Sequence, residues 1–217
     1  MTDLDLAALL VSRVCHDLAG PVGAVMNGLE VLADEDDEKS REQALKVILS
    51  AAEQAAAKLQ FARLAFGASS SRGDFVPTGD VRFAVEKLFA GGKMRLDWRA
   101  PDIHLFKREA KVLAGLSALA AECLKYGGTV SVSGENNAGV RLAVRAQGKD
   151  AKLSDEFRTA LLGGATPDLI DGRAVLPLML GLFVRADGGS VVLDTAADSV
   201  TFAVSFPRAK TAASGAH

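Results

Sequence analysis

The first 66 residues carry two long helical patterns separated by a short acidic connection. Apolar side chains recur every three or four positions from about residue 3 or 5 to Ala33, and again from about Glu38 to Phe66. The connection, residues 34–37 (DEDD), contains Asp36 and Asp37, either of which can cap the second helix. Two long helices joined by so short a turn form an antiparallel hairpin.

Each of these helices has an apolar face that a hairpin alone cannot cover. The two faces consist of Leu6, Leu10, Val14, Leu18, Val25, Leu29 and Leu32 on the first helix, and Leu45, Ile48, Ala52, Ala55, Leu59, Ala62 and Phe66 on the second. Pairing two copies of the hairpin buries both faces at once. We therefore expect a homodimer built around a four-helix bundle.

His16 points away from the apolar face of the first helix, because successive residues are rotated by about 100°. Its neighbours on the same face, at spacings of three, four and seven, are Leu9, Ser12, Arg13, Ala19, Gly20 and Gly23. Glycines weaken a helix, and Pro21 also leaves the carbonyl of Asp17 without its usual donor. Small neighbours let a partner protein approach His16, where Ser12 and Arg13 could contact an anionic group such as phosphate. A plain surface histidine on a bent helix remains the alternative.

The composition excludes several other kinds of function. The chain has 217 residues, 49% of them hydrophobic, which is typical of a globular protein, and its formal charge of −2 gives no reason to expect nucleic acid or a membrane as partner. Cys15 and Cys123 lack metal-ligand spacing, so we expect two small buried side chains and no metal site. No leader pattern or apolar run of about 18 residues is evident. We expect a cytoplasmic protein.

A second domain is expected to follow a linker at residues 67–79 (GASSSRGDFVPTG). From Asp80, taken as a helix cap, to Pro207 the patterns predict an α+β sandwich with helices over one face of a sheet. The predicted helices are 81–90, 107–126, 154–162 and 172–186, and the predicted strands are 94–99, 129–134, 140–146, 190–195 and 199–206. The proline-flanked loop with His104, and the tail 208–217 with His217, which we expect to be disordered, receive no functional role.

Several motifs taken together resemble those of dimerising histidine kinases. An outward histidine followed by an acid, with proline five residues later, resembles the H-box of their first helix. Residues 119–126 (LAAECLKY) resemble the N-box helix that ends in Asn-Ala-x-Lys-Tyr. Residues 186–189 (ADGG) followed by 200–207 (VTFAVSFP) resemble the ending His-Gly-Gly … Thr-Phe-x-Phe-x-Leu-Pro. The likeness extends over nearly the whole chain and implies that residues 80–207 are a kinase-like domain.

The chain departs from that pattern at the residues that would bind ATP. Glu122 stands where such kinases carry the magnesium-holding asparagine, and a carboxylate there repels a triphosphate unless a metal ion intervenes. Ala146-Gln147-Gly148 replaces the Asp-x-Gly motif, whose aspartate reads the adenine amino group. Residues 172–177 (GRAVLP) replace the glycine-rich lid that cradles phosphates. The resemblance thus implies a degenerate domain that binds neither ATP nor another cofactor of its own.

A scaffold that keeps the histidine and loses the nucleotide site resembles the ChpT family of histidine phosphotransferases. The likeness lies in the Cys-His-Asp run at residues 15–17, in Pro21, and in residues 59–70 (LQFARLAFGASS). It implies a phosphorelay in which the receiver domain of a hybrid histidine kinase phosphorylates His16. His16 then passes the group to response regulators of the CtrA-like or CpdR-like kind, with Mg²⁺ supplied by the receiver.

The resemblance assigns roles to the residues around His16, the nucleophile. Asp17 is expected to orient His16 or accept its proton, and Arg13 is expected to stabilise the phosphoryl oxygens. Ser12, Gly20 and Gly23 are expected to form the docking surface. For Asp17 and Arg13, the alternative that each is simply a solvent-exposed side chain without a role in transfer remains open. Two other functions also remain open: a dimeric, non-catalytic adaptor of response regulators, and an active histidine kinase.

Overall fold

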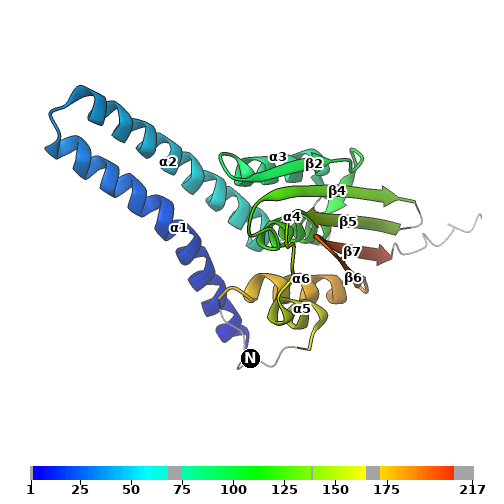
Figure 1. The fold of residues 1–217 in the computed structure, drawn as a ribbon. Helices are drawn as coiled ribbons and strands as arrows, with labels where there is room; N and C mark the ends of the chain where they lie inside the picture. The colour runs from blue at the N-terminus through cyan, green and yellow to red at the C-terminus, as the bar shows by residue number, and fades with distance from the viewer. Residues whose placement is uncertain (1, 68–74, 138, 165–171, 208–217) are drawn as a thin grey trace, which may run out of the picture.

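The computed structural model describes residues 2–67, 75–137, 139–164 and 172–207, which form a long helical hairpin followed by an α+β domain (Figure 1). The elements, in chain order, are α1 (Asp3–Asp34), α2 (Glu38–Phe66), β1 (Phe75–Pro77), α3 (Thr78–Phe89), β2 (Met94–Trp98), β3 (His104–Phe106), α4 (Lys107–Glu122), β4 (Gly128–Asn136), β5 (Gly139–Gln147), α5 (Asp155–Leu162), α6 (Val175–Ala186), β6 (Ser190–Ala196) and β7 (Ser199–Pro207). The predicted hairpin and α+β domain are confirmed.

The two hairpin helices begin at side-chain caps. Thr2 and Asp5 form a capping box at the start of α1, in which each side chain accepts a backbone N–H of the other residue. Asp37 caps α2, since its Oδ2 accepts the backbone N–H of Ser40 at 2.9 Å. Of the two aspartates predicted for this role, Asp37 is therefore the one that caps the helix. These caps fix the turn between the helices at residues 35–37.

Small residues make up most of the buried face of α2. Its buried side chains are Ala44, Ala51, Ala57, Phe61 and Ala65. Leu45, Ala52 and Leu59, which the sequence placed on the packed face, are exposed. On α1, a Cβ at Gly28 would lie 2.5 Å from Cγ1 of Ile48, so only glycine allows this close approach. A single chain therefore leaves part of the predicted apolar face of α2 uncovered, and its burial by a second copy stays a prediction.

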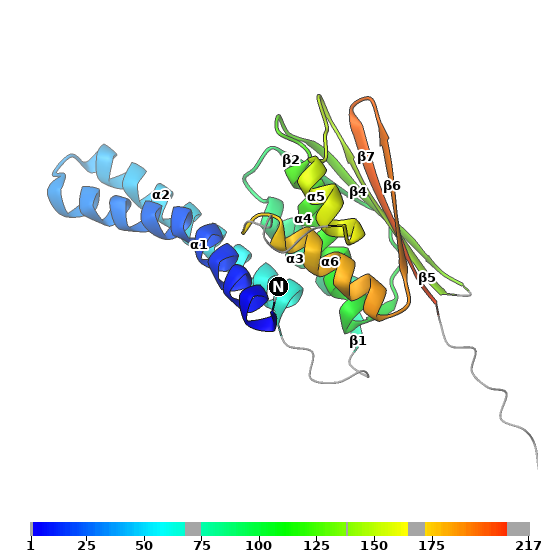
Figure 2. The same cartoon turned by 90° about the horizontal axis from the view of Figure 1, so that it is seen from below.

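The α+β domain is a five-stranded sheet with helices on one face. The strand order is β2-β4-β5-β7-β6; β2 runs parallel to β4, and the other neighbours are antiparallel. Seen from below in Figure 2, α3, α4, α5 and α6 lie between the hairpin and the sheet, and the opposite face of the sheet is uncovered. Side chains of β5 alternate accordingly, with Val140, Leu142, Val144 and Ala146 buried. The predicted one-sided sandwich is confirmed.

The linker predicted at residues 67–79 is shorter in the structure, because β1 and the start of α3 lie within that range. β1 pairs antiparallel with β3, and the rings of Phe75 and Phe106 stack with their centroids 4.8 Å apart. α3 begins at Thr78 after Pro77, so Asp80 lies in the first turn and is not the cap. His104 lies in β3 and not in a loop. A pairing between segments about 30 residues apart leaves no local pattern in a three-residue strand. Residues 68–74, and the tail 208–217 predicted to be disordered, lie outside the described residues.

Two other helix boundaries differ from the prediction. α4 ends at Glu122, four residues early, and the chain then turns through Gly127, whose φ of +89° favours glycine. α6 begins at Val175, which places Pro177 in the first turn, where its missing N–H breaks no hydrogen bond of the helix.

The base of the hairpin is attached to the second domain at two places. Phe61 and Ala65 of α2 belong to the same hydrophobic core as α3 and α4, and Leu6 of α1 packs against a small cluster that includes Leu178 of α6. Lys111 of α4 also donates a hydrogen bond to the carbonyl of Gly67, at the C-terminal end of α2. Burial lowers the pKa of Lys111. These contacts place the N-terminal half of α1 beside the C-terminal end of α4.

Candidate functional site

His16 is an exposed side chain in the N-terminal half of α1. Its side chain is 73% exposed, and its Nδ1 lies 3.6 Å from Oδ1 of Asp17. This distance suits electrostatic attraction but is too long for a hydrogen bond. Because Nδ1 faces Asp17, Nε2 is the ring nitrogen available to a partner. A neutral imidazole offers a nucleophilic nitrogen, and the exposed position of this ring suits attack on an incoming group.

Arg13 links the histidine helix to the second domain. Its Nε donates to Oδ2 of Asp17 at 2.8 Å, and one of its terminal nitrogens donates to Oε1 of Glu122 at 2.6 Å. Its other terminal nitrogen donates to the carbonyl of Arg173 at 3.4 Å. Burial alone would lower the pKa of Arg13, but the carboxylates of Glu122 and Asp17 outweigh it and raise the pKa. The guanidinium is thus held between two carboxylates, and its predicted contact with phosphoryl oxygens stays a prediction.

Pro21 and Lys58 shape the backbone next to His16. Pro21 is buried within α1 and has no N–H, so it cannot donate to the carbonyl of Asp17. Nζ of Lys58, on α2, donates to that carbonyl instead, at 2.8 Å. The sequence indicated that this acceptor needs a donor. It did not identify Lys58, because the choice depends on how the two helices align.

Replacing Lys58 by methionine is expected to destabilise the protein. The variant keeps most of the apolar stem but leaves the carbonyl of Asp17 without its donor, which costs about 1–2 kcal/mol of unfolding free energy. Urea unfolding at one fixed protein concentration measures this loss. The matched control is Lys46→Met on the same helix, because Lys46 is 73% exposed and pairs only with Glu42 among the described residues. Equal losses in the two variants would contradict a special role for Lys58.

The predicted docking residues lie around His16 in two different settings. A Cβ built at Gly20 or Gly23 would meet no atom within 4 Å, so both glycines face open space. Gly20 also lines a groove of about 650 Å³ between α1 and α2, together with Pro21, Ala24, Gln43, Lys46, Val47, Ser50, Ala51, Gln54 and Lys58. Ser12 instead faces the second domain, since its Oγ lies 3.7 Å from the position of a Cβ at Gly172. The structure therefore separates Ser12 from the two glycines.

The residues aligned with a kinase nucleotide site have other partners or are apolar. Glu122 accepts the hydrogen bond from Arg13, and Ala146 is fully buried in the core. A hollow of about 310 Å³ lies between α1, α2, α3 and α4, and Arg13, Asp17 and Glu122 line part of its wall. Among the described residues, no group of three or more His, Cys, Asp or Glu side chains could hold a metal ion.

The two cysteines lie in different environments. Cys123 is buried as predicted, and burial raises the pKa of its thiol to about 12, so it stays protonated near neutral pH. Cys15, which was predicted to be buried, is exposed in the single chain.

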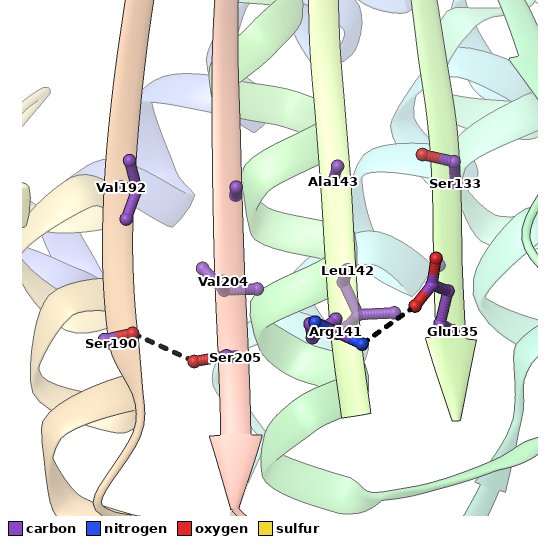
Figure 3. A pocket seen from close by; sticks show the side chains of 11 residues that line it. Ser133, Glu135, Arg141, Leu142, Ala143, Ser190, Val192, Val204 and Ser205 are labelled. Atoms are coloured by element: carbon purple, nitrogen blue, oxygen red, sulfur yellow. Dashed lines mark hydrogen bonds and ion pairs between the residues drawn. The ribbon is translucent and has the colours of Figure 1, made fainter. Parts of the chain in front are cut away.

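A second hollow lies on the uncovered face of the sheet, away from His16. It has a volume of about 450 Å³, and Figure 3 shows its floor of small side chains with Ser133, Ala143 and Ser205 on neighbouring strands. Its charged side chains, Glu135 and Arg141, form an exposed ion pair at 3.1 Å. Because the helical layer separates this face from the hairpin (Figure 2), the hollow is not part of the site around His16.

Comparisons with known proteins show the class of protein, the histidine phosphotransferases. Residues 78–199 match the family model described as the histidine phosphotransferase C-terminal domain. The chain is also 32% identical over 203 residues to the protein phosphotransferase ChpT of Brucella abortus (strain 2308), in a match that covers 93% of this chain and 96% of that protein. The solved structure of a bacterial phosphotransferase aligns with a TM-score of 0.84 and 31% identity, and covers 94% of this chain and 97% of that one.

The chain therefore belongs to the ChpT family of histidine phosphotransferases. This confirms the resemblance inferred from the motifs and the prediction of a phosphotransferase in a phosphorelay. The particular roles of His16, Asp17, Arg13, Ser12, Gly20 and Gly23 stay predictions.

Proposed function

We propose that this chain shuttles phosphoryl groups between receiver-domain aspartates on His16, without binding ATP. The observation that carries this proposal is the imidazole of His16, 73% exposed on α1 and one turn from Gly20, which lines an open groove. A receiver domain delivers its phosphoryl group only if its own surface comes close to the accepting nitrogen. The exposed ring and the small residues around it permit that approach.

The proposed reaction consists of two transfers with the same chemistry. Nε2 of His16 attacks the phosphorus of the phospho-aspartate on the first receiver. The P–N bond forms as the P–O bond breaks, and the aspartate leaves as a carboxylate. The aspartate of a second receiver then attacks the same phosphorus and releases the imidazole. Asp17 lies on the Nδ1 side of the ring, where its negative charge stabilises the imidazolium character that develops during attack.

The receiver is proposed to dock over Gly20 and Gly23 and into the adjoining groove between α1 and α2. Both glycines face open space, and the α2 side of the groove carries Lys46 and Lys58. A receiver's acidic phosphorylation site fits a surface with cationic side chains at its edge. A receiver that holds Mg²⁺ would supply the cation that neutralises charge on the phosphoryl group.

The absence of ATP binding is proposed from Glu122 and Ala146. Glu122 is engaged with Arg13 where a nucleotide-binding kinase uses an asparagine, and Ala146 offers no acceptor to an adenine amino group. Calorimetric titration with Mg·ATP is expected to give no heat of binding. A dissociation constant in the micromolar range would contradict this part of the proposal and favour an active kinase.

A homodimer is proposed because both helices of the hairpin expose large apolar side chains. On α1 these side chains form a face that consists of Leu4, Val11, Val22, Met26 and Leu29, which project in one direction at about 100° per residue, and on α2 they are Leu45, Leu49 and Leu59. A second copy covers such a face in a four-helix bundle.

By length and composition, α1 is the one described helix that could span a membrane. Pairing of hairpins accounts for the same apolar residues, and we place the protein in the cytoplasm.

The chemical stability of the phosphorylated protein tests the proposal. We expect wild-type protein incubated with a phosphorylated receiver to acquire a phosphoryl group that is stable in base and lost in acid. Peptide mapping is expected to place the group on His16. A label that is stable in acid, or that maps to another residue, would contradict the proposal.

A further inference from the structure

We infer that Glu122, a residue of the second domain, is a positioning residue for phosphoryl transfer at His16. Its carboxylate holds Arg13, and Arg13 in turn holds Asp17 beside the imidazole. The inference rests on the proposed function, and it gives the degenerate domain a part in the transfer reaction. Glu122 touches neither the imidazole nor the transferred group, so it acts through Arg13.

The contacts form an unbroken series from α4 to His16. Glu122 accepts from Arg13 at 2.6 Å, Arg13 donates to Oδ2 of Asp17 at 2.8 Å, and Oδ1 of Asp17 lies 3.6 Å from Nδ1 of His16. The side chain of Arg13 is only 15% exposed, so water screens these charges less than at an open surface. Both carboxylate contacts are short, as expected of charge-assisted hydrogen bonds.

The planar guanidinium explains how one carboxylate can orient another. Its donors form a rigid fork, so fixing one terminal nitrogen on Glu122 also fixes the direction in which Nε points. Nε takes Oδ2 of Asp17, which leaves Oδ1 turned toward His16. Without Glu122, Arg13 keeps only the longer hydrogen bond to the carbonyl of Arg173 and its contact with Asp17, so the carboxylate of Asp17 is held in one orientation less firmly.

The position of Glu122 within α4 supports a role of this kind. Glu122 is the last residue of α4, whose final turn contains no basic residue. A carboxylate is unfavourable at the C-terminal end of a helix, because the helix dipole is negative there. Helix stability therefore does not account for a glutamate at this position. The cation of Arg13, supplied by the other part of the chain, compensates its charge.

Single-turnover transfer from a phosphorylated receiver to His16 tests the inference. We expect Glu122→Ala to lower the maximal transfer rate about tenfold without changing the receiver concentration that gives half the maximal rate. We expect Glu122→Asp, which keeps the carboxylate, to restore the rate to within about threefold of wild type. In an Arg13→Ala background, Glu122→Ala is expected to cost about twofold or less, because its effect requires Arg13.

The matched control is Glu86→Ala, which removes a carboxylate from the exposed Arg82–Glu86 pair on α3 and is expected to leave the rate unchanged. Three results would overturn the inference. They are an unchanged maximal rate in Glu122→Ala, a rise in the half-saturating receiver concentration with no fall in the maximal rate, or an equal fall in rate when Glu122→Ala is made in the Arg13→Ala background.

The wild type and His16→Ala in the same series separate this inference from the proposed function. If the wild type acquires no acid-labile phosphate, the proposed function fails. If the wild type is phosphorylated and only the Glu122 variants behave otherwise than expected, the inference alone fails.

Discussion

Replacing His16 by alanine is expected to abolish the flow of phosphoryl groups from one receiver to the other. The imidazole is the group that we propose to carry the phosphoryl, and an alanine methyl cannot form a P–N bond. We expect the rate of transfer to fall by at least about 1,000-fold, to the limit of detection. The measurement follows ³²P from a phosphorylated donor receiver to an acceptor receiver in the presence of each variant.

His104→Ala is the matched control for this experiment. His104 is exposed in β3, outside the site around His16, so its loss is expected to leave transfer unchanged. Circular dichroism and size-exclusion chromatography check that both variants fold as the wild type does. If phosphoryl flow survived in His16→Ala, His16 would not be the carrier. A dimeric adaptor that brings two partners together would then be the better account.

Replacing Val22 by glutamate is expected to convert the proposed dimer into a monomer. Val22 lies on the exposed apolar face of α1, where its side chain is 50% exposed in the single chain. Full burial of an exposed valine contributes about 1.5–3 kcal/mol, so the half-exposed Val22 gains about half of that, and a two-fold interface contains the residue twice. A buried, unpaired carboxylate adds a further penalty. We expect the dissociation constant of the dimer to rise by a factor of more than about 100.

Light scattering coupled to size-exclusion chromatography measures this change. The chain has a mass of 22.6 kDa, so a monomer is distinguished readily from a species of twice that mass. Val31→Glu is the matched control, because Val31 is similarly exposed, at 44%, but projects from the opposite side of α1. A wild-type monomer, or equal effects of the two substitutions, would contradict the proposed interface.

The helical hairpin could be predicted from sequence because its signals are local. The periodicity of residues 3–33 and 38–66 and the cap at Asp37 depend only on near neighbours, and the structure confirms them. The partner that covers the apolar face of α2 could not be predicted in the same way. Ile48 of the predicted face lies beside Gly28 of α1, whereas Leu45 and Leu59 of the same face are exposed in the single chain. Periodicity identifies an apolar face but does not say which partner covers it.

The arrangement of the site could be predicted only in part, for a similar reason. Pro21 indicated an unpaired carbonyl at Asp17, but its donor, Lys58, lies on the other helix. Arg13 was predicted to face a partner's phosphoryl group, and the structure shows it held by Asp17 and Glu122. Glu122 is 109 positions away in the sequence, and that contact depends on how the hairpin packs against α4. Such long-range ion pairs leave no periodic signal.

The most direct test of the central claim is a relay assay from which nucleotide is absent. A receiver carrying ³²P-phospho-aspartate, freed of ATP and of its kinase, is mixed with the wild-type protein and an unlabelled second receiver, and samples are quenched over time. We predict that the label leaves the first receiver, passes transiently through an acid-labile adduct on His16, and accumulates on the second receiver. Transfer that requires added ATP, or that proceeds between the receivers with no label ever on His16, would contradict the account.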